Sequence, residues 1–321
     1  MARLRQFVTP HYQSLMGASD DPLGRQVVAQ PGEDIEHPAL SWDPLDEKKY
    51  SPVPGLIHRY PHIALLLVTP KCFAYCRFCF RASYLNDIHG PTILERWAPV
   101  EHYLQTHAEI QEVLLSGGDP LMLSDAQFRD LGDRIRKISK DMTIRVGTRA
   151  PVFQPNRFSE GLLDHLEALR PVVLSIHVNH AREVTSEFKE VVLALMKRGI
   201  SCYSQSVLLK GVNDDSATLR KLFRTLVASH VRPYYLHLCD RAQGTAHFMV
   251  HPNRAIELWR SLWGALPGMA IPHLVFDDAS HLGKVPLQDR PTVHTDAEGR
   301  VLITSLHDSG DTRSYAYPSD V

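Results

Sequence analysis

The amino-acid sequence predicts an α/β fold, a partial (βα)6 barrel of the TIM type. Strand-like and helix-like segments alternate six times between residue 63 and about residue 277. Strands that alternate with helices form parallel sheets with right-handed crossovers. A closed barrel has eight such units, so six leave it open on one side. The length of 321 residues suits one large α/β domain or two small ones.

Three segments are expected along the chain. Residues 1–57 form an extended amino-terminal arm with one short helix, because turn-forming pairs such as Pro31-Gly32 and Asp43-Pro44 interrupt any long helix. Residues 58–277 form the barrel. Residues 278–321 hold a loop around Lys284 and a short β-rich tail, with a plausible hairpin turn at 296–299.

The barrel strands are expected where apolar and β-branched residues gather. The six runs are Ile63–Thr69, Glu112–Leu115, Thr143–Thr148, Val172–Val178, Cys202–Leu208 and Pro233–Cys239. The tail strands are Thr292–Thr295 and Arg300–Ser305. Polar residues mark helix starts, since Ser124 and Gln127 form a capping box. The other expected helix starts are Ser159, Ser186, Ser216 and Asn253, the last opening a helix to Trp263.

Composition excludes several classes of protein. Apolar residues make up 44% and charged residues 22% of the chain, as in soluble globular proteins. A formal net charge of −1 gives no reason to expect nucleic acid or an anionic membrane as a partner. We expect no membrane span and no secretion signal, because no apolar run is long enough for either. Thiols that must stay reduced to hold a metal indicate the cytoplasm.

Three of the five cysteines, Cys72, Cys76 and Cys79, directly follow the first strand in a segment that we call the cysteine loop, residues 70–79. Three thiolates can bind three irons of a [4Fe–4S] cluster and leave the fourth open, whereas electron-transfer clusters use four cysteines. Barrels of this type place their chemistry at the carboxyl ends of strands. A zinc site with a histidine as fourth ligand is the alternative, although CxxxCxxC is not a usual zinc spacing.

The other two cysteines, Cys202 and Cys239, lie in strand-like runs and are expected to be ordinary buried thiols. A second polar segment, Ser116-Gly117-Gly118-Asp119, follows the second strand. Paired glycines let the backbone approach a ligand closely, and a polar neighbour can hold an amino group. A plain strand-to-helix turn is the alternative.

The spacing and context of these segments resemble the radical S-adenosylmethionine (SAM) enzymes. The resemblance implies that the open iron holds the amino and carboxylate groups of SAM. An electron from the cluster then cleaves a C–S bond and gives a 5′-deoxyadenosyl radical. It also implies that Ser116, Gly117, Gly118 and Asp119 contact SAM.

Further motifs narrow the resemblance to the lysine 2,3-aminomutase family, and the chain is also similar to the lysine aminomutase that modifies elongation factor P. They include His58-Arg59-Tyr60-Pro61, Gly147-Thr148-Arg149-Ala150-Pro151, His177-Val178-Asn179-His180, residues 205–214 and Gly283-Lys284-Val285-Pro286-Leu287. The family uses SAM together with pyridoxal 5′-phosphate (PLP). It moves an α-amino group to the neighbouring carbon.

The resemblance implies a role for each matching residue. Lys284 is the PLP lysine, since PLP is held by a lysine amine. Arg59 and Arg149 hold the phosphate, which needs cations, and the pocket is lined by Tyr60, His177 and Gln205. A surface or structural role is the alternative for each of them.

The substrate contacts follow from the same resemblance. Arg81 grips the substrate carboxylate with its planar fork. Asp240 and Asp277 receive a distal ammonium group, with Asp278 an alternative to Asp277. A pair of buried carboxylates is costly without a cation, so a basic amino acid is favoured over glutamate.

The sequence therefore predicts a SAM- and PLP-dependent radical aminomutase that acts on a basic amino acid, lysine first. The sequence departs from the family pattern in places, such as the single glycine in residues 278–283. One alternative is therefore an enzyme with the same cofactors whose substrate is arginine or another amino acid, or whose Cβ radical has another fate. A non-catalytic iron–sulfur redox or sensor protein is a further alternative. Expected partners are a reductant such as flavodoxin or ferredoxin and a second copy of the chain, as a dimer or tetramer.

Overall fold

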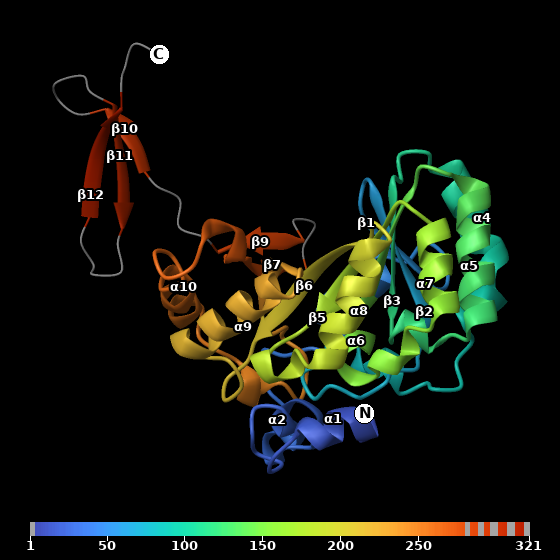
Figure 1. Ribbon diagram of the computed structural model, residues 1–321, viewed down its shortest axis with the longest axis horizontal. Coiled ribbons are helices and arrows are strands. Elements are labelled where there is room, and N and C mark those ends of the chain that lie inside the picture. Colours follow the sequence, from blue (N-terminus) through green and yellow to red (C-terminus); the bar gives the residue numbers. More distant parts are fainter. Residues whose placement is uncertain (1–3, 280–282, 288–291, 296–300, 307–311, 318–321) are drawn as a thin grey trace.

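A computed structural model describes residues 4–279, 283–287, 292–295, 301–306 and 312–317. Its main feature is a curled sheet of nine strands that lie side by side in sequence order (Figure 1). The strands are β1 (Leu56–Tyr60), β2 (Ile63–Thr69), β3 (Glu112–Gly117), β4 (Thr143–Thr148), β5 (Val172–His177), β6 (Ser201–Leu208), β7 (Arg232–Leu238), β8 (His273–Asp277) and β9 (Lys284–Pro286).

The strands β2 to β8 run parallel to one another, and β1 and β9 pair antiparallel at the two edges. The predicted partial barrel is confirmed, and each of the six predicted strands is present within two residues of its expected ends. The sheet has three strands beyond the six expected: β1 at one edge, and β8 and β9 at the other, where β8 adds to the parallel set and β9 pairs antiparallel with β8. This pairing places Lys284 directly opposite Asp277.

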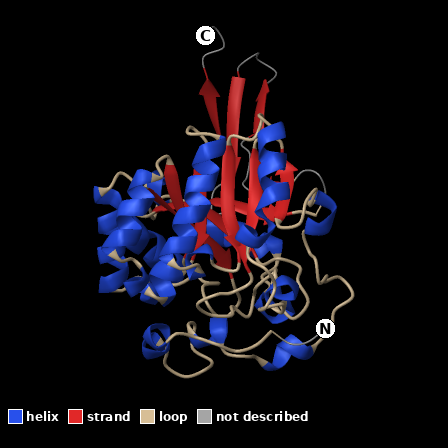
Figure 2. Ribbon diagram, turned by 90° about the vertical axis from the view of Figure 1, so that its right-hand side faces the viewer, coloured by secondary structure: helices blue, strands red, loops and turns tan. Residues whose placement is uncertain are grey.

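Helices cover one side of the curled sheet (Figure 2). The main ones are α4 (Trp97–Thr106), α5 (Asp125–Ile138), α7 (Glu160–Ala168), α8 (Ser186–Lys197), α9 (Ser216–Ala228) and α10 (Pro252–Arg260). The capping box at the start of α5 is confirmed, since Ser124 and Gln127 each bind the backbone N–H of the other. Within the described part of the chain, no helix has both the length and the apolar character to cross a membrane.

Three helices begin or end within one turn of the residue that the sequence predicts. Thr185 and Asp215 cap α8 and α9, so Ser186 and Ser216 are the first helical residues and do not cap the helices. The side chain of His251 caps α10, which ends at Arg260 and not at Trp263.

The amino-terminal arm contains more helical turns than the one predicted. Its short elements are α1 (Pro10–Leu15), α2 (Gly24–Val27) and the 3₁₀ turns η1 (Pro31–Asp34) and η2 (Glu47–Tyr50). Thr9 caps α1, and Pro10 occupies a position where its missing N–H costs nothing. The arm packs on the barrel of its own chain, below the sheet in Figure 1, with Tyr12 and Gln26 completely buried.

The tail forms a separate antiparallel sheet of β10 (Thr292–Thr295), β11 (Val301–Leu306) and β12 (Thr312–Tyr317). The first two are the strands that the sequence predicts, and the expected turn at 296–299 lies outside the described residues. The third strand was not predicted.

Packing between β3 and the cysteine loop explains one of the paired glycines. Gly118 donates its N–H to the carbonyl of Thr69 at 2.7 Å, and Asp119 donates to that of Lys71 at 2.8 Å. A Cβ at Gly118 would overlap the Lys71 carbonyl and lie 2.9 Å from the Thr69 oxygen. Both obstacles are backbone atoms, which cannot turn away as a side chain would.

We therefore expect Gly118→Ala to lower the free energy of unfolding by about 1–3 kcal/mol, the usual cost of forcing extra atoms into a packed region. Gly268→Ala is the matched control, because a Cβ there meets nothing within 4 Å. Urea unfolding followed by circular dichroism measures both. Equal midpoints for the two variants would show that the glycine is not required by this contact.

Candidate active site

A cavity of about 490 Å³ opens at the carboxyl ends of the barrel strands. Its size is in the range of pockets that bind small ligands and cofactors. Its lining brings together Cys72, Cys76, Cys79 and Lys284, although more than 200 residues separate the cysteine loop from the lysine. Asp277 lines the cavity and its alternative, Asp278, does not. The other residues that the sequence singles out for ligand contact also line it: Arg59, Tyr60, Arg81, Ser116, Gly117, Gly118, Asp119, Arg149, His177, Gln205 and Asp240.

The three cysteines of the loop are free thiols that face this cavity. Burial raises the pKa of Cys79 to about 12 and that of Cys72 well above its ordinary value, and neighbouring thiolate charge adds to both. Such thiols keep their protons unless a cation replaces them, so this donor set fits a group that brings several iron cations. Among the described residues, no three His, Cys, Asp or Glu side chains surround a point where one metal ion could sit. In a cluster each cysteine binds its own iron.

The carboxylate of Asp119 connects β3 to β4. It accepts hydrogen bonds from the Thr148 hydroxyl at 2.8 Å and from the backbone N–H of Arg149 at 2.9 Å. Burial nevertheless raises the pKa of Asp119 to about 6. The structure thus gives this carboxylate a joining role between two strand ends, beside its place in the cavity lining.

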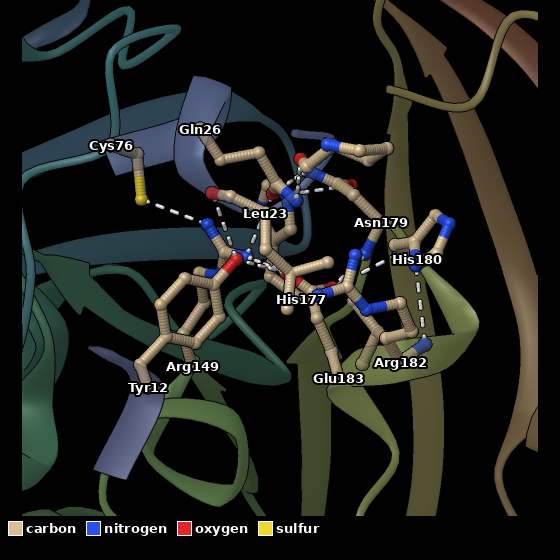
Figure 3. A network of polar contacts seen from close by, with 12 residues as sticks. Tyr12, Leu23, Gln26, Cys76, Arg149, His177, Asn179, His180, Arg182 and Glu183 are labelled. Carbon is tan, nitrogen blue, oxygen red and sulfur yellow. Dashed lines mark hydrogen bonds and ion pairs between the residues drawn. The ribbon is translucent and has the colours of Figure 1, made fainter. Parts of the chain in front are cut away.

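Arg149 lies against the cysteine loop (Figure 3). Its Nη1 donates to the Cys76 sulfur at 2.9 Å, and its Nη2 donates to Glu183 at 2.8 Å and to Gln26 at 3.1 Å. Arg59, the other candidate for the phosphate of PLP, donates to the backbone carbonyl of Asp278. The two arginines therefore contact different segments, Arg149 the cysteine loop and Arg59 the segment that precedes Lys284.

His177 and Gln205 are neighbours across β5 and β6. Burial, with the positive charge of Arg149, lowers the pKa of His177 well below its ordinary value. Its Nε2 lies 3.1 Å from the Asn179 side-chain oxygen. The imidazole is therefore neutral at physiological pH and can serve as a hydrogen-bonding wall of the cavity.

The side-chain amine of Lys284 begins a chain of polar contacts that runs through Asp277 to His237. Its Nζ donates to Asp277 at 2.7 Å, and the other oxygen of Asp277 lies 2.8 Å from Nδ1 of His237. Burial opposes the charged carboxylate, but the hydrogen bond from His237 and the charge of Lys284 keep the pKa of Asp277 below its usual range. The amine also lies 5.5 Å from the centre of the Tyr235 ring.

Tyr60 fixes the backbone of the lysine segment. Its hydroxyl accepts the N–H of Lys284 at 3.0 Å. The preceding Gly283 has a φ of +66°, and a Cβ there would overlap the same hydroxyl. The single glycine of this segment therefore stands where a close approach requires it.

Arg81 is already paired in the structure. Its Nε donates to both oxygens of Glu47 at 3.0 Å, its Nη2 to one of them at 2.6 Å, and its Nη1 to the Ser116 hydroxyl at 2.8 Å. A guanidinium has five N–H groups. These contacts leave one N–H on each terminal nitrogen that meets no acceptor among the described residues, and both nitrogens belong to a residue that lines the cavity.

Asp240 is the unpaired carboxylate of the cavity. Its oxygens accept no hydrogen bond from any residue of the described ranges. Burial, together with the neighbouring charge of Asp277, raises its pKa to about 7. Asp277, by contrast, is satisfied by Lys284 and His237. The two carboxylates that the sequence treats alike therefore have different surroundings.

The sequence did not single out several residues that hold the site. They are Tyr12, Gln26, Glu47, Glu183 and His237. Tyr12, Gln26 and Glu47 come from the arm, whose course over the barrel has no signature in the local sequence. His237 carries a weak signal, because it lies near the carboxyl end of a predicted strand.

Comparison with known proteins gives a consistent result. A family model described as the radical SAM superfamily matches residues 66–223. An L-lysine 2,3-aminomutase of Methanococcus maripaludis is 37% identical, over 98% of this chain and 72% of its own length. A putative L-lysine 2,3-aminomutase of Aquifex aeolicus is 40% identical, over 87% of this chain and 76% of its own length.

Among solved structures, SuiB of Streptococcus suis aligns with a TM-score of 0.51 and 10% identity, covering 67% of this chain and 48% of that one. At this level of identity the likeness concerns the fold alone.

The unpaired state of Asp240 predicts that the stability of the chain depends on pH. Its folded-state pKa of about 7 lies above its ordinary value of 3.8, so the folded chain binds more protons than the unfolded chain between these values. The contribution of Asp240 to stability therefore falls as the pH rises from about 4 to about 7. We expect Asp240→Asn to remove this loss, so that it stabilises the ligand-free chain by about 2 kcal/mol more at pH 8 than at pH 5.

Urea unfolding of the ligand-free protein at the two pH values measures the difference. Asp141→Asn, at an exposed position, controls for the loss of one negative charge. A difference between wild type and Asp240→Asn that does not change with pH would mean that the carboxyl titrates as in the unfolded chain.

Proposed function

This chain belongs to the lysine 2,3-aminomutase family of radical SAM enzymes, and we propose that it uses PLP to move the α-amino group of a basic amino acid, lysine first, to Cβ. Its membership makes it an isomerase that depends on a [4Fe–4S] cluster, SAM and a reductant. The observation that carries the finer proposal is that the cysteine loop, Lys284 and the unpaired Asp240 line the same cavity.

The cysteines Cys72, Cys76 and Cys79 would hold the cluster. When the cluster and SAM are bound, they supply a 5′-deoxyadenosyl radical that takes hydrogen from an unactivated carbon. The chain itself contributes the shape of this region. The hydrogen bonds of Gly118 and Asp119 to Thr69 and Lys71 fix the start of the cysteine loop against β3.

Lys284 would hold PLP, which when bound supplies a conjugated ring that stabilises an unpaired electron during migration of the nitrogen. Asp277 keeps Nζ of Lys284 in one place, and His237 keeps Asp277 in place in turn. Arg59 would hold the phosphate, which its contact with the segment that precedes the lysine supports. Tyr60 supports the lysine segment, because its hydroxyl accepts the backbone N–H of Lys284.

The substrate would lie between Arg81 and Asp240. The two free N–H groups of Arg81 suit an α-carboxylate, since a planar guanidinium binds carboxylates in pairs of hydrogen bonds. A distal ammonium would give Asp240 the cation that it lacks in the free protein. Glutamate would instead place a second negative charge beside an unpaired carboxylate, which is unfavourable in a buried site. Charge alone therefore favours a basic amino acid.

The role of Lys284 predicts the loss of PLP on substitution. Lys284→Ala should lose the visible absorption band of lysine-bound PLP after reconstitution, whereas Lys210→Ala, at an exposed lysine, should keep it. Borohydride reduction followed by peptide mass spectrometry identifies the modified lysine. Stoichiometric PLP on a lysine other than Lys284, or none in the wild-type protein, would contradict the assignment.

The choice of substrate is tested with an amino-acid panel. The protein, reconstituted with cluster, SAM and PLP without oxygen and reduced, is incubated with lysine, arginine, ornithine or glutamate, and products are identified by mass spectrometry. We expect lysine to become β-lysine. Asp240→Asn should raise the KM for lysine at least about tenfold, since loss of one charged contact costs on the order of 1.4 kcal/mol or more.

The control for this variant is Asp141→Asn, which should keep the wild-type KM. If lysine stays unchanged and another amino acid of the panel is consumed, that amino acid is the substrate and the prediction of lysine is wrong. Consumption of glutamate in particular would show that Asp240 does not select for a distal cation.

A further inference from the structure

The contact between Arg149 and Cys76 joins a buried cation to a cysteine of the cysteine loop. Nη1 of Arg149 lies 2.9 Å from the sulfur, and only 7% of the residue is exposed. The guanidinium carbon lies 4.5 Å from the centre of the Phe153 ring. Water is therefore largely excluded, and the charge of the arginine acts on the sulfur with little screening.

Glu183 holds this arginine in position (Figure 3). Its Oε1 accepts from Nη2 of Arg149 at 2.8 Å and from the Tyr12 hydroxyl at 2.9 Å. Its Oε2 accepts the backbone N–H groups of Asn179 at 2.6 Å and His180 at 3.0 Å. These four hydrogen bonds hold both oxygens of Glu183, and the residue is 1% exposed.

The arm contributes two of the fixed groups. Tyr12 comes from α1 and Gln26 from α2, and the side-chain oxygen of Gln26 accepts from both Arg149 and Asn179. The backbone carbonyl of Gln26 also accepts the N–H of Arg77, next to Cys76. The arm therefore touches the arginine and the cysteine loop together.

The chemistry of the cluster gives this contact a consequence. Reduction adds one electron from an external reductant to the cluster, with no proton and no new bond to the protein. Hydrogen bonds to the cysteine sulfurs and nearby positive charge stabilise the more negative, reduced cluster and so raise its reduction potential.

We propose that Arg149 raises the reduction potential of the cluster by donating to the Cys76 sulfur, and that Tyr12 and Gln26 are positioning residues of the arm that hold it there. The inference needs the cluster but neither PLP nor lysine chemistry. It can therefore fail while the proposed function stands, and the reverse also holds.

The test is a redox titration of the full chain with its cluster reconstituted without oxygen, using dithionite and mediators and followed by EPR of the reduced cluster. Arg149→Gln should lower the potential by at least about 59 mV, which is a tenfold drop in the equilibrium constant for one-electron reduction. Arg149→Lys keeps the positive charge but loses the planar guanidinium, so its reduction potential should lie between those of the wild type and Arg149→Gln. Tyr12→Phe, which removes one donor to Glu183, should give a smaller shift in the same direction.

Arg145→Gln is the matched control, because Arg145 lines the same cavity but pairs with Glu112 at 2.5 Å. The cluster of this variant should have the same reduction potential as that of the wild type. Iron and sulfide content, measured for each variant, separates a changed potential from a lost cluster.

Should Arg149→Gln fail to hold the cluster, Arg149→Lys and Tyr12→Phe decide the matter. Wild-type potentials in both would overturn the proposal. Weaker SAM binding by Arg149→Gln at an unchanged potential would also overturn it, and would make the arginine a SAM contact instead.

Discussion

The site depends on buried ion pairs that hold the arginines around the cysteine loop. Arg77 pairs with Glu33 and Arg81 with Glu47, and in both cases the carboxylate comes from the amino-terminal arm. Arg149 pairs with Glu183 from the segment after β5. A buried charge is costly unless it is paired and hydrogen-bonded. Each arginine can therefore stay beside the cysteines only because a carboxylate reaches it.

This requirement gives the arm a function in the fold. An arm that only covered the carboxyl ends of the strands could do so with apolar side chains. Here it supplies Glu33 and Glu47 to two arginines of the cysteine-loop region and Gln26 to the third. Removal of one partner of a buried pair leaves an uncompensated charge, so the arm and the cysteine loop have to order together.

The sequence predicts those features that depend on local residue patterns or on resemblance to the family. The alternation and length of the apolar runs predict the strands, and Ser124 and Gln127 predict the start of α5. The family motifs predict the residues that line the cavity. The sequence does not predict the contacts of those residues with one another. The hydrogen bond from Arg149 to Cys76 is an example, because the partners that orient the arginine, Glu183 and Gln26, lie far from it in the sequence.

Gly118 is a second case in which the sequence predicts the residue type that a position needs but not the contact that explains it. A pair of glycines after a strand suggested close approach to a ligand, and the nearest obstacle to a side chain at the second one is the Lys71 carbonyl of the chain itself. The sequence indicates that this position requires a glycine. Only the path of the neighbouring cysteine loop shows which atom would clash with a side chain there. In the same way, the sequence did not predict β9, because a strand of three residues has no clear periodicity of its own and forms only by pairing with β8.

The charges of the cavity give a reason for its two aspartates to differ. Glu47 compensates Arg81 and Asp277 compensates Lys284, so Asp240 is left without a cation in the free protein. The two carboxylates therefore differ in what neutralises them. Lys284 and His237 already hold Asp277, whereas only a proton or an added cation can neutralise Asp240. Because an unpaired buried charge is costly, this part of the cavity is where a cationic group gains the most from binding.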